Sequence, residues 1–171
     1  MGGLSPESLA AIRIVFFQEC EQHLAVIETG LSALQGGDRD AETLNGVFRA
    51  VHSIRGAAGI FALDGLVQFS HRFETALAEV RAGRLELGPD ILRVLQRADD
   101  LLAELVEAAR EDRAVDPGRT APMLDELAAI IPESPEPSQF GALNFKPRTV
   151  VFQPLDPAGR IQRARLGPGA G

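Results

Sequence analysis

Residues Phe48–Phe61, FRAVHSIRGAAGIF, decide the fold of this chain. Extended back by one turn and read at 3.6 residues per turn, the stretch places its apolar side chains on one stripe of a helix. The stripe consists of Leu44, Val47, Val51, Ile54, Ala58 and Phe61. At roughly 100° per residue, His52 lies about 130° from the middle of this stripe. The pattern therefore predicts an amphipathic helix that buries the stripe and turns His52 away from the core.

The outward face of this helix carries a cation and two glycines beside His52. Arg55 follows at three residues, Gly56 at four and Gly59 at seven, so all of them lie near His52 on the predicted surface. A glycine inside a helix costs about 1 kcal/mol relative to alanine, so two on one face require a reason. We interpret them as clearance that lets another protein surface approach the imidazole.

The same periodicity predicts four further helices. Counting the helix of His52 as the second, the predicted bounds of all five are Ser5-Pro6-Glu7 to Gly36-Gly37, a cap at Asp38 or Asp40 to about Phe61, a cap at Asp64 to Gly83, Pro89 to about Asp112, and a cap at Thr120 to Pro132. The apolar face of the first helix consists of Leu9, Ile12, Phe16, Cys20, Leu24, Ile27, Leu31 and Leu34. Short loops rich in glycine and proline predict an all-α, up-and-down antiparallel bundle of four helices plus a fifth C-terminal helix.

A change of composition divides the chain after this bundle. Residues 1–131 form the predicted domain, and 132–171 are predicted to be a Pro-rich linker and a mostly irregular basic tail, interpreted as the truncated start of a following domain. Within the tail, Phe145–Phe152 is typical of one or two strands. Residues 139–171 carry a net charge of +4, which leaves −11 for residues 1–138 of a chain whose total is −7.

Bulk composition excludes several classes of protein. A net charge of −7 argues against nucleic acid or an anionic membrane as the main partner. The single cysteine permits no intrachain disulfide. No apolar run approaches the ~18 residues of a membrane span, and no signal peptide is evident, so we expect a cytoplasmic protein without a membrane partner.

The run Phe48–Gly56, followed by His71-Arg-Phe-Glu74 on the next predicted helix, resembles the histidine-phosphotransfer (HPt) domains of CheA-type chemotaxis histidine kinases. The resemblance covers about the first 130 residues, and motif, spacing and helix order agree in it. The family usually has lysine at the position of Arg55. Both side chains are cations, but arginine is a planar fork and lysine a compact point charge.

This resemblance implies a function in a two-component phosphorelay. His52 is expected to be the nucleophile, phosphorylated in trans by an ATP-bound CheA-type kinase domain, and to donate the phosphoryl group to an aspartate of a CheY-like receiver. The resemblance makes Glu74 the base that orients the imidazole and selects its tautomer, and makes His71 a member of the supporting network. The charge of Arg55 would offset that of the transferring phosphoryl group.

Other kinds of site find little support in the sequence. Cys20-x-x-His23 offers too few ligands for a structural zinc site. No histidine has the glutamate three residues before it that a di-iron bundle needs, and no phosphate-binding Gly-x-x-x-x-Gly-Lys-Ser/Thr loop occurs. We therefore expect no metal site and no ATP site in this chain, with ATP and Mg²⁺ supplied by the kinase or the receiver.

Two alternative functions remain open at this stage. The alternatives to a domain of a CheA-type kinase are a stand-alone phosphorelay intermediate, which takes its phosphoryl group from one receiver and gives it to another, and a non-catalytic helical adaptor that has lost phosphotransfer. The linker and basic tail argue weakly against the first alternative, because they resemble a connection to further domains of a longer chain. Arg55 in place of lysine is the one feature that favours the second.

Overall fold

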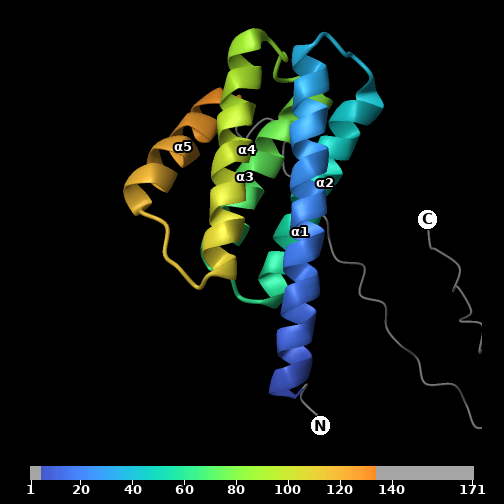
Figure 1. The fold of residues 1–171 in the computed structure, drawn as a ribbon. Helices are drawn as coiled ribbons and strands as arrows, with labels where there is room; N and C mark the ends of the chain where they lie inside the picture. The colour runs from blue at the N-terminus through green and yellow to red at the C-terminus, as the bar shows by residue number, and fades with distance from the viewer. Residues whose placement is uncertain (1–4, 134–171) are drawn as a thin grey trace, which may run out of the picture. The chain divides into compact units, whose positions relative to one another are not determined.

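The computed structural model describes residues 5–133, and this part of the chain consists of five helices without a strand. The helices are α1 (Pro6–Gln35), α2 (Ala41–Ile60), α3 (Asp64–Arg81), α4 (Pro89–Arg110) and α5 (Pro117–Ile130). Helices α1 to α4 run alongside one another with alternating direction, and α5 packs against α3 and α4 (Figure 1). The predicted all-α, up-and-down bundle is confirmed. The predicted linker and tail lie almost wholly outside the described residues.

The stripe predicted from the central stretch forms part of the core. Val47, Val51, Ile54 and Ala58 are fully buried on α2. They join the apolar faces of the other helices in one hydrophobic cluster, in which two phenylalanines of α3, Phe69 and Phe73, are among the largest fully buried side chains. Leu44 and Phe61, at the two ends of the stripe, are partly buried against the same cluster. Burial of this stripe fixes the rotation of α2 and leaves His52 on the outer surface.

The starts of α1 and α2 follow the predicted capping, whereas that of α3 does not. The Ser5 hydroxyl accepts a hydrogen bond from the Ser8 amide at 3.2 Å, and the Asp40 carboxylate accepts one from the Glu42 amide at 2.9 Å. The prediction that Asp64 caps α3 is wrong, because Asp64 is already the first helical residue and Leu63 precedes it without a side-chain cap. The carbonyl of this N-cap residue, Leu63, accepts the first helical hydrogen bond from the Val67 amide at 2.9 Å, but its apolar side chain cannot accept a second.

Helix α5 begins earlier than the sequence pattern predicted. Its N-cap is Asp116 rather than Thr120, and the Asp116 carboxylate accepts a hydrogen bond from the Gly118 amide at 2.8 Å. Pro117 occupies the first helical position, where its fixed φ favours a helix and its missing N–H is not needed. Pro122 consequently lies inside the helix and not in its first turn.

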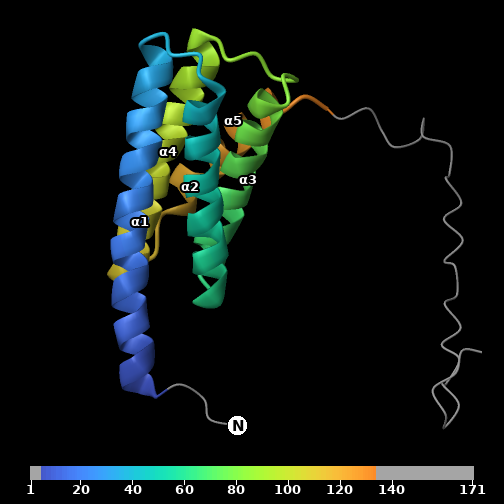
Figure 2. The ribbon, with the colours of Figure 1, turned by 90° about the vertical axis from the view of Figure 1, so that its right-hand side faces the viewer.

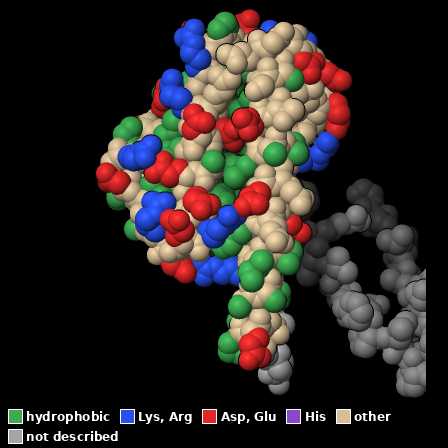
Figure 3. Space-filling model, in the orientation of Figure 1, with side chains coloured by type: hydrophobic (Ala, Val, Ile, Leu, Met, Phe, Trp, Pro, Cys, Tyr) green, Lys and Arg blue, Asp and Glu red, His purple; other side chains and the backbone are tan. Residues whose placement is uncertain are grey.

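The N-terminal end of α1 projects beyond the neighbouring helices (Figure 2). Leu9 and Ile12 continue the apolar stripe of α1, yet they are 48% and 42% exposed. Ile14 and Val15 are exposed as well, and hydrophobic side chains gather on the projecting end of α1 in Figure 3. The expected apolar face of α1 is therefore buried only from Phe16 onwards, because α1 has 30 residues whereas α2, which packs beside it, has 20.

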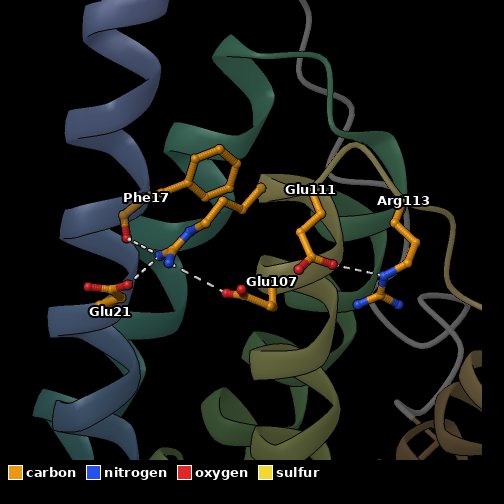
Figure 4. Close-up of polar contacts among 6 residues, drawn as sticks. Phe17, Glu21, Glu107, Glu111 and Arg113 are labelled. Atoms are coloured by element: carbon orange, nitrogen blue, oxygen red, sulfur yellow. Dashed lines mark hydrogen bonds and ion pairs between the residues drawn. The ribbon is translucent and has the colours of Figure 1, made fainter.

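A polar seam joins α1 to α4 on the outside of the bundle. The guanidinium of Arg110 on α4 donates to the Glu21 carboxylate at 2.5 Å and to the Phe17 carbonyl at 3.5 Å, and both acceptors belong to α1 (Figure 4). Glu107, one turn before Arg110, is ion-paired with the same guanidinium at 3.5 Å. Because these groups are partly solvated, the seam adds little to the stability of the bundle.

No helix in the described part of the chain combines the length and the apolar character that crossing a membrane requires.

Candidate functional site

The candidate site lies on the outer face of α2 and α3. His52 stands in the middle of α2, and its side chain is 56% exposed. Its neighbours Val51 and Ile54 are fully buried, so the helix cannot rotate His52 inwards without exposing them. The position of the imidazole is thus a direct consequence of the burial of the apolar stripe.

Glu74 of α3 supplies the principal contact of the imidazole. The His52 Nδ1 atom lies 3.1 Å from Glu74 Oε1, at hydrogen-bond distance, although the two residues are 22 positions apart in the chain. The Glu74 side chain is only 13% exposed, because it lies on the flank of α3 that packs beside α2. This carboxylate was expected near His52, and the structure brings the two together.

Arg55 shares the same carboxylate. Its Nε atom lies 3.1 Å from Glu74 Oε2, and the arginine side chain is 29% exposed. The contact is an ion pair without hydrogen-bond geometry, since Oε2 is buried and has no hydrogen-bond partner. The carboxylate therefore lies between an imidazole and a guanidinium, each contacting a different oxygen. Sequence reasoning placed Arg55 beside His52 but did not anticipate its pairing with Glu74.

The two glycines lie where the clearance hypothesis requires. Gly56 and Gly59 are exposed, and a Cβ atom added to either would meet no other atom within 4 Å. No packing partner inside the bundle requires glycine at these positions. Their small size leaves the surface next to His52 open.

His71 is exposed on α3, one turn before Glu74. Its carbonyl accepts a hydrogen bond from the Thr75 hydroxyl at 2.8 Å. Among residues 5–133, however, its imidazole forms no hydrogen bond or ion pair with Glu74 or with His52. The geometry therefore supports a role in the network around His52 less directly for His71 than for Arg55.

Two residues of the site were missed by sequence reasoning. The ring of Phe48 stacks with the imidazole of His52, with 6.1 Å between the ring centroids and 13° between the planes. The guanidinium carbon of Arg81, the last residue of α3, lies 4.2 Å from the centroid of the Phe48 ring. A signal for Phe48 was present, because it precedes His52 by four residues and so lies on the same face. Nothing in the local sequence pointed to Arg81.

The arrangement is suited to nucleophilic chemistry at one ring nitrogen. A carboxylate beside Nδ1 favours the tautomer in which Nδ1 carries the proton, and Nε2 then keeps a free lone pair. Nucleophiles of this kind are commonly oriented by a third group held within hydrogen-bond reach. Among residues 5–133, no three His, Cys, Asp or Glu side chains gather in a way that would hold a metal ion.

Comparisons with known families and proteins show which family the chain resembles. The model of the Hpt domain family matches residues 11–113. The chain is 54% identical over 119 residues to the chemotaxis protein CheA of Rhizobium meliloti, a match that covers 70% of this chain and 16% of the relative. It is 44% identical over 123 residues to CheA of Cereibacter sphaeroides, with 68% and 18% covered. The chain thus spans less than a fifth of the length of these curated relatives.

Two solved structures share the fold. The phosphorylated P1 domain of CheA3, solved in complex with CheY6 from R. sphaeroides, aligns with a TM-score of 0.63 and 28% identity over 69% of this chain and 93% of its own. The solution structure of the histidine phosphotransfer domain of CheA aligns with a TM-score of 0.63 and 22% identity over 74% of this chain and 96% of its own, which shows the likeness of fold alone. The resemblance stated from the sequence motif is confirmed.

Proposed function

This chain belongs to the Hpt domain family, and from that premise we propose that it is the phosphoryl-carrying domain of a CheA-type chemotaxis histidine kinase. In this proposal, His52 accepts a phosphoryl group from ATP bound to a separate kinase domain and donates it to an aspartate of a CheY-like receiver. The observation that carries the proposal is the exposed imidazole whose Nδ1 atom lies 3.1 Å from the carboxylate of Glu74.

The proposed reaction uses the imidazole in its neutral form. The lone pair of Nε2 forms a bond to the γ-phosphorus as the bond from phosphorus to the bridging oxygen breaks, and the electron pair leaves with ADP. In the second transfer, an aspartate oxygen of the receiver attacks the phosphorus, and the N–P electron pair returns to Nε2. Glu74 accepts a hydrogen bond from Nδ1–H throughout, which holds the ring in the reactive tautomer and stabilises the positive charge that develops on it.

Arg55 has two roles in this proposal. While His52 is unmodified, its guanidinium pairs with Glu74 and keeps that carboxylate in place. Once Nε2 carries a phosphoryl group, the same cation offsets part of the added negative charge. A planar guanidinium with several N–H donors can contact a carboxylate and a phosphoryl oxygen together, which suits arginine to this shared position. His71 is proposed to contribute only to the surrounding polar surface.

The partners and their cofactors complete the proposal. ATP and Mg²⁺ belong to the kinase domain or to the acidic pocket of the receiver, and this chain binds neither. The faces of α2 and α3 around His52 would contact both partners in turn, in the cytoplasm where a chemotaxis kinase works.

A transfer assay tests the proposal. The 171-residue chain is incubated with labelled ATP, Mg²⁺ and a CheA-type kinase catalytic domain, and a CheY-like receiver is then added. We expect label that is stable to base and labile to acid, as phosphohistidine is, and that leaves the chain when the receiver is added. A chain that takes up no label, or takes up label only from a phosphorylated receiver and not from the kinase, would contradict the proposal.

Glu74→Ala is expected to slow phosphorylation of His52 by roughly 10- to 100-fold without unfolding the bundle. The substitution removes the hydrogen-bond acceptor at Nδ1 and leaves Arg55 free to turn to solvent. The matched control is Asp64→Ala, which removes an exposed carboxylate from the other end of the same helix. Initial rates with a limiting amount of kinase domain measure the effect, and equal rates for the two variants would remove Glu74 from the mechanism.

Gly56→Gln is expected to weaken docking of the receiver. The receiver concentration that gives half the maximal transfer rate should rise about tenfold. The fold should be kept or slightly stabilised, because a Cβ at this position meets nothing and glutamine is the better helix former. Gly65→Gln is the control, since a Cβ also finds open space there but the position is at the start of α3, nine residues before Glu74. Unchanged half-saturation in the Gly56 variant would show that clearance is not needed.

A further inference from the structure

The hydrogen bond to Glu74 does not by itself fix the orientation of His52. It fixes one atom of the imidazole, Nδ1, but the plane of the ring can still turn about that contact. The side chain is 56% exposed, so solvent would not prevent such a rotation. The direction of the Nε2 lone pair depends on the ring plane, because the lone pair lies in that plane. A second contact is therefore needed to determine where the nucleophile points.

Phe48 provides that second contact. Its ring is nearly parallel to the imidazole, with 13° between the two planes and 6.1 Å between their centroids. This separation corresponds to an offset stack, an arrangement that aromatic pairs prefer. Phe48 is partly buried against the hydrophobic core, whereas His52 is exposed, so the phenylalanine is the better anchored of the two rings.

Arg81 holds the phenylalanine from the neighbouring helix. Its guanidinium carbon lies 4.2 Å from the centroid of the Phe48 ring, well within the range of a cation–π contact. Arg81 follows Glu74 by seven residues, two helical turns, so both lie on the flank of α3 that faces α2. The site thus has three links between the same two helices: Glu74 to His52, Glu74 to Arg55, and Arg81 to Phe48.

We propose that Phe48, clamped by Arg81, is a positioning residue that sets the plane of the His52 imidazole and thereby aims Nε2 at the phosphorus. This inference rests on the proposed function and adds to it a requirement that the Glu74 contact does not meet. Phosphoryl transfer needs the nitrogen, the phosphorus and the leaving or attacking oxygen roughly in line, so the requirement applies to transfer to His52 and to transfer from it. A ring that turns freely spends less time in that alignment, and the loss appears in the maximal rate rather than in the affinity for the partner.

The first test needs no partner protein. In the 171-residue chain labelled with ¹³C and ¹⁵N, NMR relaxation of the His52 ring carbons gives an order parameter, and the ring ¹⁵N shifts give the tautomer. We expect Phe48→Leu to lower the order parameter clearly and to leave the tautomer as it is, while Phe48→Tyr keeps both. An order parameter that is unchanged in the leucine variant overturns the proposal.

The second test separates positioning from docking. With phosphorylated chain and a saturating CheY-like receiver, we expect Phe48→Leu to reduce the transfer rate about tenfold and Phe48→Tyr to restore it. The receiver concentration for half the maximal rate should not change. A tyrosine variant as slow as the leucine variant, or an effect confined to the half-saturating concentration, overturns the proposal.

Arg81→Gln keeps the inference testable if the leucine variant unfolds. Arg81 is exposed, so its replacement removes the cation from Phe48 without opening the core. We expect a lower order parameter for His52 and a transfer rate about threefold lower; wild-type values of both would overturn the role of the clamp. If the wild-type chain takes up no phosphoryl group, the proposed function fails, whereas the order parameters still decide whether Phe48 and Arg81 hold the ring.

Discussion

Replacing His52 by glutamine is expected to abolish the acid-labile phosphate on this chain while the bundle stays folded. The amide of glutamine has no lone pair of comparable nucleophilicity, so no N–P bond forms. Because His52 is exposed on the outer face of α2 and its imidazole is hydrogen-bonded to Glu74, its replacement should change the free energy of unfolding by no more than about 1 kcal/mol. We expect label from ATP to fall at least 100-fold, to the background of the assay.

The chain contains a matched control for this experiment. His71→Gln makes the same chemical change at an exposed histidine on the neighbouring helix. It should leave most of the phosphorylation intact, because His71 lies outside the contact between His52 and Glu74. Persistent acid-labile label in the His52 variant, or equal loss in both variants, would refute the assignment of His52 as the nucleophile.

Asp99→Asn is expected to stabilise the bundle at neutral and alkaline pH, and to do so much less at pH 4. Asp99 lies on α4, and its Oδ1 atom is buried without a hydrogen-bond partner. Burial raises the pKa of this carboxyl to about 7, with smaller contributions from the negative charges of Asp100 and of Glu28 on α1. The ordinary value for an unfolded aspartate is about 3.9.

The sign of the effect follows from these two pKa values. Between about pH 4 and pH 7 the folded chain holds a proton on Asp99 that the unfolded chain has released, so the free energy of unfolding falls as the pH rises. Above pH 7 the folded chain carries an unpaired, partly buried charge. A pKa difference of about 3 corresponds to at most about 4 kcal/mol, and we expect a gain of about 2 to 4 kcal/mol for the asparagine variant at pH 8.

Urea unfolding followed by circular dichroism at pH 4 and pH 8 measures this difference. Asp125→Asn, at an exposed aspartate of α5, is the control for the loss of one negative charge from an acidic bundle. The gain for Asp99→Asn should appear at pH 8 and nearly vanish at pH 4. If the gain in the free energy of unfolding were equal at both pH values, or no larger than that of the control, ionisation of Asp99 would not destabilise the folded chain.

Local sequence determined the helices and the exposure of His52. The 3.6-residue spacing of Val47, Val51, Ile54 and Ala58 is a property of neighbouring residues, so it placed the apolar stripe on the core and His52 on the surface before any contact was known. The same local logic failed at two helix starts. The tight turn before Asp64 and the Asp116-Pro117 pair decided those boundaries, and the pattern of apolar residues does not record either feature.

The apolar pattern also did not predict which part of α1 extends beyond the neighbouring helices. The apolar positions of α1 run continuously from Leu9 to Leu34, and nothing in that spacing indicates that Leu9 and Ile12 have no neighbouring helix to cover them. Whether an apolar side chain is buried depends on where the other helices end, and that is a property of the assembled bundle.

The chemistry of the site divides in the same way. The sequence by itself determined an outward-facing histidine with a cation and two glycines beside it, because these residues share one helix and a fixed geometry of 100° per residue. The resemblance carried by the motif added Glu74 as the partner of the imidazole, and only the tertiary structure decided that Arg55 shares this carboxylate and that Arg81 lies over Phe48. Those contacts join residues 19 to 33 positions apart in the chain. Their distances depend on how α2 packs against α3. That packing is determined when the apolar faces of both helices are buried together, so the sequence of one helix cannot determine it.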